Sequence, residues 1–309
     1  MINTENELIE LSMKYLKKNY DYTWLKTMLL KASKCCQKAD STLITGSSHA
    51  LYGFDERMWD NAVNVSMHSQ DIYYDYLCAK NIIANSRHQI TKCFIVLGYY
   101  IAYQDLSRSN IMREKMITKI YYPIFHDAHN WGQPYSIDRW KEIGNYTEQV
   151  KEICENMVTI ALYDSAYFSD VRKRSTLFDF KKRSWEELDE EERCIFGKER
   201  AEMHNKVMKH NESLCENTQI MRKYIEYLYN ENIRPIVVVT PFTKEYNNFV
   251  NPEMKNSLLN MLNELPQEID FVDFNESDLF DKTDFMDTDH LNEKGAKKVS
   301  EILINMFGK

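Results

Sequence analysis

Residues 42–50 read Thr-Leu-Ile-Thr-Gly-Ser-Ser-His-Ala, an apolar run that ends in one glycine and two serines. The run at 42–45 is short and apolar, which suits a strand covered on both faces, as in a parallel sheet. Gly46 allows the backbone to turn closely at the carboxyl edge of such a sheet, where open α/β sheets bind ligands. The stretch therefore predicts a strand and a tight turn that presents Ser47 and Ser48.

Four further runs of the same kind follow, at residues 62–65, 93–97, 235–239 and 269–272. Segments with helical spacing separate them, most clearly 214–230 and 293–307, where apolar residues recur at i, i+3, i+4 and i+7. Strands that alternate with helices predict an α/β fold. We expect a three-layer, doubly wound sandwich with a mainly parallel five-stranded sheet.

The domain organisation is expected to be simple. The chain has only 8 Gly and 6 Pro and no Pro-, Gly- or Ser-rich boundary, so we expect a single α/β domain over 1–309. Residues 1–39 predict N-terminal helices, two of them between 5 and 37. The distance from the third strand run to the fourth exceeds what a crossover helix requires, which predicts a mostly helical insertion or cap at 106–208.

Composition and charge narrow the classes of function. An apolar share of 43% and a charged share of 28% are those of a soluble globular protein. The formal net charge of −8 gives no electrostatic reason to expect a nucleic-acid partner. Neither a P-loop nor a GxGxxG pattern is present, so nucleotide hydrolysis and dinucleotide redox chemistry lack support, and we expect no cofactor.

The expected location is cytoplasmic. The first residues, Met-Ile-Asn-Thr-Glu-Asn-Glu, lack the basic-then-apolar order of a signal peptide. No apolar run approaches the roughly 20 residues that span a bilayer, so we expect no membrane span. The seven cysteines are an odd number without a CxxC pair, which favours reduced thiols.

A second polar pattern lies near the other end of the chain. Residues 287–290 read Asp-Thr-Asp-His immediately before the last amphipathic segment. A carboxylate three residues before a histidine can bind the imidazole Nδ1–H and leave Nε2 free to act as a base toward a hydroxyl. The alternative is that the serines and aspartates of the two patterns only cap their helices, with His290 at the surface.

A strand that ends in G-x-S, combined with D-x-x-H before the C-terminal helix, resembles the SGNH (GDSL-like) hydrolase superfamily. The resemblance covers roughly residues 40–105 and 232–309. It implies that Ser48 is the nucleophile, His290 the general base and Asp287 its orienting carboxylate.

The resemblance also implies an oxyanion hole made in part by the backbone N–H groups of Ser48 and Ser69, since Ser69 falls on the usual glycine of the second block. The third block should read G-x-N-D, but residues 97–101 read Leu-Gly-Tyr-Tyr-Ile, and Tyr100 occupies the asparagine position. Loss of one oxyanion donor typically costs about 10²–10³ in rate. Either another group, such as the Tyr100 hydroxyl, substitutes, or the enzyme is slow, or the protein is not an enzyme.

Four residues are candidates for substrate binding: His49, His68, Gln70 and His204. His204 is expected to form a polar patch with Arg200 that meets the substrate at the edge of the insertion; the alternative is that His204 is a residue of a helix surface. His126 and His129 have a spacing that can bind metal on a helix, but no third ligand is evident, and we expect no metal.

The patterns at 46–53 and 69–74 also resemble uncharacterised SGNH-like proteins of bacterial surface-polysaccharide clusters. The resemblance implies a serine-dependent esterase or O-acyltransferase, with acetyl as the expected group, acting on a carbohydrate or surface-glycan precursor. The expected partner is thus a small-molecule or glycan ester, with an acyl donor in the transferase case. Two rivals are a non-catalytic carbohydrate-binding or assembly protein on a degenerate SGNH fold, and an unrelated α/β protein.

Overall fold

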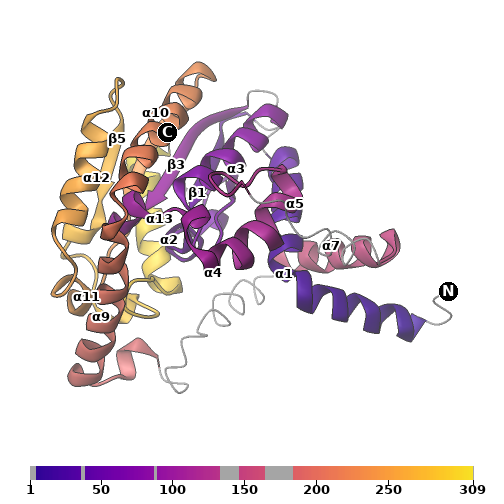
Figure 1. The fold of residues 1–309 in the computed structure, drawn as a ribbon, viewed down its shortest axis with the longest axis horizontal. Helices are drawn as coiled ribbons and strands as arrows, with labels where there is room; N and C mark the ends of the chain where they lie inside the picture. The colour runs from indigo at the N-terminus through magenta and orange to yellow at the C-terminus, as the bar shows by residue number, and fades with distance from the viewer. Residues whose placement is uncertain (1–4, 36–38, 87–88, 133–145, 164–183, 309) are drawn as a thin grey trace. The chain divides into compact units, whose positions relative to one another are not determined.

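The computed structural model describes residues 5–35, 39–86, 89–132, 146–163 and 184–308 (Figure 1). The chain divides into two compact units, the first from residues 1–31 and 106–171 and the second from 32–105 and 172–309. The expected insertion at 106–208 falls across both units. Its bounds, and the single domain over 1–309, stay predictions.

The second unit is built on a five-stranded sheet with the order β2-β1-β3-β4-β5, in which all neighbouring pairs are parallel. The strands are β1 (Ser41–Gly46), β2 (Ala62–Asn64), β3 (Ile90–Leu97), β4 (Arg234–Val239) and β5 (Asp270–Asp273). All five strands overlap the runs predicted from the sequence. The α/β fold class is confirmed, and β1, which lies between β2 and β3, marks the point where the strand order reverses.

Helices cover both faces of this sheet. The helices are α2 (Ser48–Gly53), α3 (Ile72–Asn85), α9 (Glu190–Asn205), α10 (Asn211–Asn230), α11 (Lys244–Asn247), α12 (Glu253–Asn263) and α13 (Glu293–Phe307). Helices α3 and α10 pack on one face and α2 and α13 on the other, while α9 lies beside α11 (Figure 1). The layers are those of the expected doubly wound sandwich.

Alternation along the strands divides the side chains between the two faces. One core joins the sheet to α13 and includes Ile44, Phe94, Val96, Ile236, Val238, Val299 and Leu303. The residues between them in β1 and β3 point to the other face, where Thr45 Oγ1 lies 2.9 Å from the hydroxyl of Tyr224 in α10. This period of two on both faces is what a buried parallel sheet requires.

A buried polar cluster lies on the α3 face, at the carboxyl end of β1. Asp75 of α3 accepts hydrogen bonds from Thr45 Oγ1 at 3.0 Å and from Gln70 Nε2 at 2.8 Å. The Gln70 amide also donates to the Gly46 carbonyl at 3.1 Å. Burial raises the pKa of Asp75 to about 7, although these hydrogen bonds oppose the shift. The cluster ties the end of β1 to the loop after β2.

The first unit is helical in its described part. It contains most of α1 (Glu5–Cys35), with α4 (Asn110–Met112), a π-helix (Arg113–Tyr121), α5 (Tyr122–Phe125) and α7 (Glu148–Tyr163). Non-helical backbone at Asn19, with φ −122° and ψ 22°, divides α1, so the two helices expected in 5–37 are its two halves. Tyr15 of α1 packs on Val150 and Cys154 of α7.

Two general expectations can be checked within the described ranges. None of the helices there is both long and apolar enough to cross a membrane. Cys78, Cys93, Cys154, Cys194 and Cys215 are free thiols.

The variant Asp75→Asn tests the buried cluster. The folded state holds the carboxyl proton up to about pH 7, whereas the ordinary pKa of an aspartate is 3.8, so the folded chain binds more protons between these values. The free energy of unfolding should therefore fall as the pH rises through this window, by at most about 4 kcal/mol for this group. Denaturant titrations from about pH 4 to about pH 8 should show this decrease in the free energy of unfolding in the wild type and not in Asp75→Asn.

The exposed carboxylate of Asp278 provides the control, and Asp278→Asn should keep the wild-type slope. A slope that is the same in Asp75→Asn and in the wild type would contradict the assignment.

Candidate active site

Ser48, His290 and Asp287 form a continuous hydrogen-bonded chain. Ser48 Oγ lies 2.8 Å from His290 Nε2. His290 Nδ1 lies 3.0 and 2.9 Å from the two carboxylate oxygens of Asp287. All three residues are buried. In such an arrangement the carboxylate orients the imidazole, and the imidazole can take the proton of the hydroxyl.

The turn that carries Ser48 depends on Gly46. Its φ is 138°, and a Cβ there would lie 2.3 Å from the carbonyl oxygen of Val96 in β3. The glycine lets β1 lie close to β3 and then turn at once into α2, whose first residue is Ser48. Ser47 occupies the N-cap position of α2 without a side-chain capping hydrogen bond. The capping interpretation therefore fits Ser47 by position alone, whereas Ser48 Oγ is bonded to His290.

The loop before α13 organises its own carboxylate. Asp287 Oδ1 accepts the backbone N–H groups of Asp289 at 3.0 Å and His290 at 2.9 Å. The N-cap of α13 is Asn292, whose side chain accepts the N–H of Gly295. The interpretation of these aspartates as caps of the last helix is wrong.

The electrostatic surroundings favour the charged form of His290. Burial alone would lower the pKa of this imidazole, but the carboxylates of Asp287 and Asp289 outweigh it and raise the pKa above 6.5. The imidazolium that forms when His290 takes a proton is therefore stabilised by the site.

Sequence reasoning missed the ionic partner of the second carboxylate. Asp289 is buried and forms a bidentate ion pair with Arg200 of α9, in which Nε lies 3.0 Å from both carboxylate oxygens and Nη2 lies 2.9 Å from Oδ2. Asp289 Oδ1 lies 3.7 Å from His290 Nδ1. Asp289 directly precedes His290 in the sequence, which was a signal for the second carboxylate. Arg200 lies 89 residues from Asp289 and belongs to no motif that would have connected the two.

Two of the expected substrate-binding histidines lie near the triad. The His49 ring stacks on the His290 ring, with centroids 5.1 Å apart and an interplanar angle of 27°. His204 Nδ1 lies 2.7 Å from the hydroxyl of Tyr246. Burial lowers the pKa of His49 to about 3, helped by the charge of His290, and it also lowers that of His204. Both imidazoles are therefore buried and neutral.

The loop after β2 holds three more candidates. Ser69 has a φ of 56°, in the left-handed region that favours glycine, which fits its place at the usual glycine of the second block. His68 is exposed, and its Nε2 lies 2.8 Å from the hydroxyl of Tyr52. Gln70 is buried with its amide bonded to the Gly46 carbonyl and to Asp75, so it supports the turn from inside, and its expected contact with substrate stays a prediction.

Tyr100 occupies the position of the missing asparagine as a buried side chain. Its ring stacks on that of His204, with centroids 3.8 Å apart. Burial raises the pKa of the phenol to about 12, although Arg200 opposes the shift. A neutral phenol keeps its proton for donation. Its role as an oxyanion donor stays a prediction, as do those of the backbone N–H groups of Ser48 and Ser69.

One group of three potential metal ligands occurs among the described residues. His49, Asp289 and His290 have ligand atoms within 4.8 Å of one another. However, His290 Nδ1 is bonded to Asp287, and Asp289 already binds a guanidinium, so a cation here would displace existing partners. The other predicted spacing, His126 and His129, lies in a non-regular segment where both residues have positive φ.

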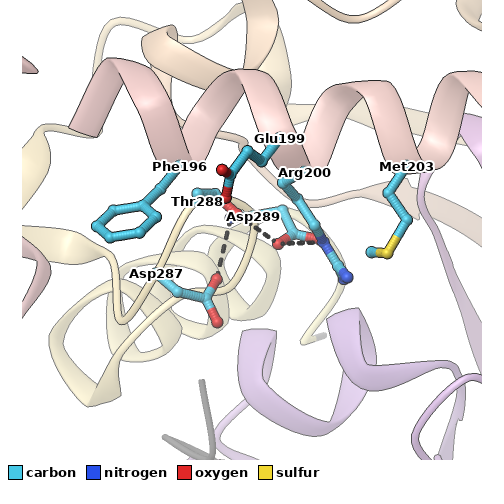
Figure 2. A pocket seen from close by; sticks show the side chains of 7 residues that line it. All are labelled: Phe196, Glu199, Arg200, Met203, Asp287, Thr288 and Asp289. Carbon is cyan, nitrogen blue, oxygen red and sulfur yellow. Dashed lines mark hydrogen bonds and ion pairs between the residues drawn. The ribbon is translucent and has the colours of Figure 1, made fainter. Parts of the chain in front are cut away.

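A pocket of about 190 Å³ lies on the carboxylate side of the triad. It is lined by Phe196, Glu199, Arg200, Met203, Asp287, Thr288 and Asp289 (Figure 2). Figure 2 shows the ion pair of Arg200 and Asp289 at its centre, below α9. Asp287 lines this pocket but Ser48 does not, so the pocket reaches the acid end of the triad and not the nucleophile.

Comparison with known proteins adds little. A protein family of unknown function matches residues 160–309, a stretch that holds Arg200 and the Asp287–His290 loop but not Ser48. A search of curated proteins finds no match. The functional assignment therefore depends on the geometry of the site.

Gly46→Ala tests the close approach of β1 to β3. The added Cβ would meet a backbone carbonyl in a strained conformation, so we expect a loss of about 3 kcal/mol or more in the free energy of unfolding. Chemical denaturation measures it.

Gly132→Ala is the matched control, because a Cβ there has nothing within 4 Å, and it should stay within about 0.5 kcal/mol of the wild type. Equal stability of the two variants would contradict the proposed constraint at the turn.

Proposed function

We propose that this chain is a serine-dependent esterase or O-acyltransferase with Ser48 as nucleophile, His290 as general base and Asp287 as orienting carboxylate. One observation carries the proposal: Ser48 Oγ lies 2.8 Å from His290 Nε2 while Asp287 holds Nδ1 of the same ring. Ser48 and His290 are 242 residues apart, so no local capping requirement explains their contact.

The proposed reaction has two steps. His290 takes the Ser48 proton as Oγ attacks an ester carbonyl, and the tetrahedral intermediate collapses to an acyl-enzyme as His290 returns the proton to the leaving alcohol. In the second step His290 activates water or a sugar hydroxyl, which takes the acyl group and restores Ser48. Asp287 stabilises the imidazolium in both steps. No cofactor is needed.

The negative oxygen of the intermediate would be received by the backbone N–H groups of Ser48 and Ser69, with the Tyr100 hydroxyl as a third donor. The positive φ of Ser69 supports its assignment, since the family pattern places a glycine there. The asparagine of that pattern is absent, so we expect a slow enzyme if the Tyr100 hydroxyl does not reach the oxyanion.

The proposed substrate is an acylated carbohydrate or surface-glycan precursor, with acetyl as the acyl group. The similarity of residues 46–53 and 69–74 to SGNH-like proteins of polysaccharide clusters supports the carbohydrate. Ser48 is 7% exposed, and a nucleophile with so little free surface favours a small acyl group.

A non-catalytic carbohydrate-binding or assembly role is the second candidate. The observation that favours it is Tyr100, whose buried ring is packed against His204 where the family pattern places an oxyanion donor. This role would keep the fold and lose the activated serine.

Labelling with a fluorophosphonate probe separates the two candidates. The wild type and Ser47→Ala should be labelled and Ser48→Ala should not, because only Ser48 is bonded to His290. Ser47 is the matched control, since it is the same residue type one position away. Labelling that persists in Ser48→Ala would reject this nucleophile, and a wild type that is never labelled would favour the binding role.

The pH dependence of that labelling tests the base. Neutral His290 is the active form and nearby carboxylates raise its pKa, so the rate should rise with pH through a midpoint above 6.5. His290→Ala should lower the rate at least about 10³-fold. A rate that is constant from about pH 5 to 9, or unchanged in His290→Ala, would rule out His290 as the base.

A further inference from the structure

Two carboxylates lie beside the same imidazole nitrogen. Asp287 is bonded to His290 Nδ1 at 2.9 Å, and Asp289 Oδ1 lies 3.7 Å from that atom. The second carboxylate is therefore just beyond hydrogen-bond distance. A mechanism with one orienting carboxylate leaves the role of Asp289 unexplained.

Arg200 determines where Asp289 lies. It binds both carboxylate oxygens from α9, and its side chain is 16% exposed. A planar guanidinium that binds both oxygens fixes the orientation of the carboxylate as well as its charge. Asp289 is thereby held in a geometry that leaves Nδ1 of His290 to Asp287.

The helix that supplies Arg200 is itself closely packed. A Cβ on Gly197 would lie 2.6 Å from the backbone of Glu245, so α9 and α11 are in close contact there. One turn earlier, Arg193 forms a buried ion pair with Glu245, with Nε 3.1 Å from Oε1. The guanidinium of Arg200 is therefore presented by a rigid support and not by a loose surface helix.

A second imidazole is also within reach of Asp289. His49 Nε2 lies 3.9 Å from Asp289 Oδ2, is completely buried and makes no hydrogen bond to any described residue. Without the guanidinium, Asp289 would keep the hydrogen bond from Thr288 Oγ1 at 2.9 Å, and its other oxygen could accept from His49. The ion pair with Arg200 occupies both carboxylate oxygens.

The charged and titratable groups around His290 come from several elements. They include Asp287 and Asp289 on its own loop, His49 and Tyr52 on α2, His68 after β2, and Arg200 and His204 on α9. Burial and the guanidinium lower the pKa of His290, whereas the two aspartates raise it. Charges interact strongly in a buried site because the effective dielectric constant is low. Removing either Arg200 or Asp289 should therefore change the pKa of His290 measurably.

We propose that Arg200 is a positioning residue for the base: it holds Asp289 in a bidentate ion pair that neutralises the second carboxylate and leaves Asp287 alone to orient His290. This inference rests on the proposed function for its catalytic meaning, but the charge relation is a property of the folded chain. Helix α9, which carries none of the G-x-S and D-x-x-H residues, thus contributes a residue that controls the base.

The test uses the full chain with four variants at Arg200 and Asp289, one control variant and two measurements. NMR titration of the His290 Cε1–H gives its protonation midpoint, and fluorophosphonate labelling against pH gives the midpoint of reactivity. Arg200→Gln should raise both midpoints by about one pH unit, because Asp289 is then not neutralised. Asp289→Asn should lower them, because a buried guanidinium is left beside the imidazole.

The double variant Arg200→Gln/Asp289→Asn should return the midpoints to within about 0.5 unit of the wild type, and Arg200→Lys should restore most of the wild-type value. Arg234→Gln is the matched control, since it removes an exposed ion pair with Asp270, and it should leave the His290 midpoint unchanged. Thermal unfolding shows whether each variant folds. If a single variant fails to fold, the double variant, which removes both charges, still tests the ion pair.

Midpoints that do not move, or that move in the same direction in the two single variants, would overturn the proposal. Normal labelling with unmoved midpoints rejects the role of Arg200 and leaves the proposed function intact. The expected NMR shifts without any labelling reject the proposed function and support the charge relation.

Discussion

Strand β1 lies so close to β3 at Gly46 that a side chain there would meet the Val96 carbonyl at 2.3 Å. This contact forces a glycine at the end of β1 and makes the chain turn at once into α2. Ser48 is therefore placed at the carboxyl edge of the sheet, where the strand order reverses. The Asp287–His290 loop meets the serine at the same edge. The rest of the site depends on this turn.

The site combines several buried charges, and it is stable only because they are paired. Asp287 binds an imidazole and two backbone N–H groups, and Asp289 binds a bidentate guanidinium. An unpaired charge in such surroundings would cost several kcal/mol. The same pairing keeps two carboxylates beside one histidine, with only Asp287 hydrogen-bonded to it. Structure and proposed chemistry thus depend on one electrostatic arrangement.

The sequence was sufficient where a pattern is local. Short apolar runs predicted all five strands, and the spacing of apolar residues predicted α10 and α13. The G-x-S and D-x-x-H patterns identified Ser48, Asp287 and His290, since each pattern lies within a few residues and both sit at strand or helix ends. That the two patterns meet in space was implied only by the resemblance to the SGNH superfamily.

The sequence was insufficient where partners are distant or where a polar residue points inward. Arg200 and Asp289 are 89 residues apart, and no periodicity connects them. Gln70 was expected to be a loop residue facing substrate, but its amide donates a hydrogen bond to the buried Asp75. Nothing in the sequence distinguishes Asp75 from an acidic residue on the exposed face of a helix. The expected insertion lay in a stretch without strand patterns, so the sequence contained no signal for the division between the two units.

The most direct test of the hydrogen-bonded chain is proton NMR in water. The His290 Nδ1–H, bound to Asp287, should give a far-downfield resonance that disappears in Asp287→Ala and in His290→Gln and persists in Ser48→Ala. A resonance that persists in Asp287→Ala, or one that is absent from the wild type across the pH range in which His290 is protonated, would contradict the account.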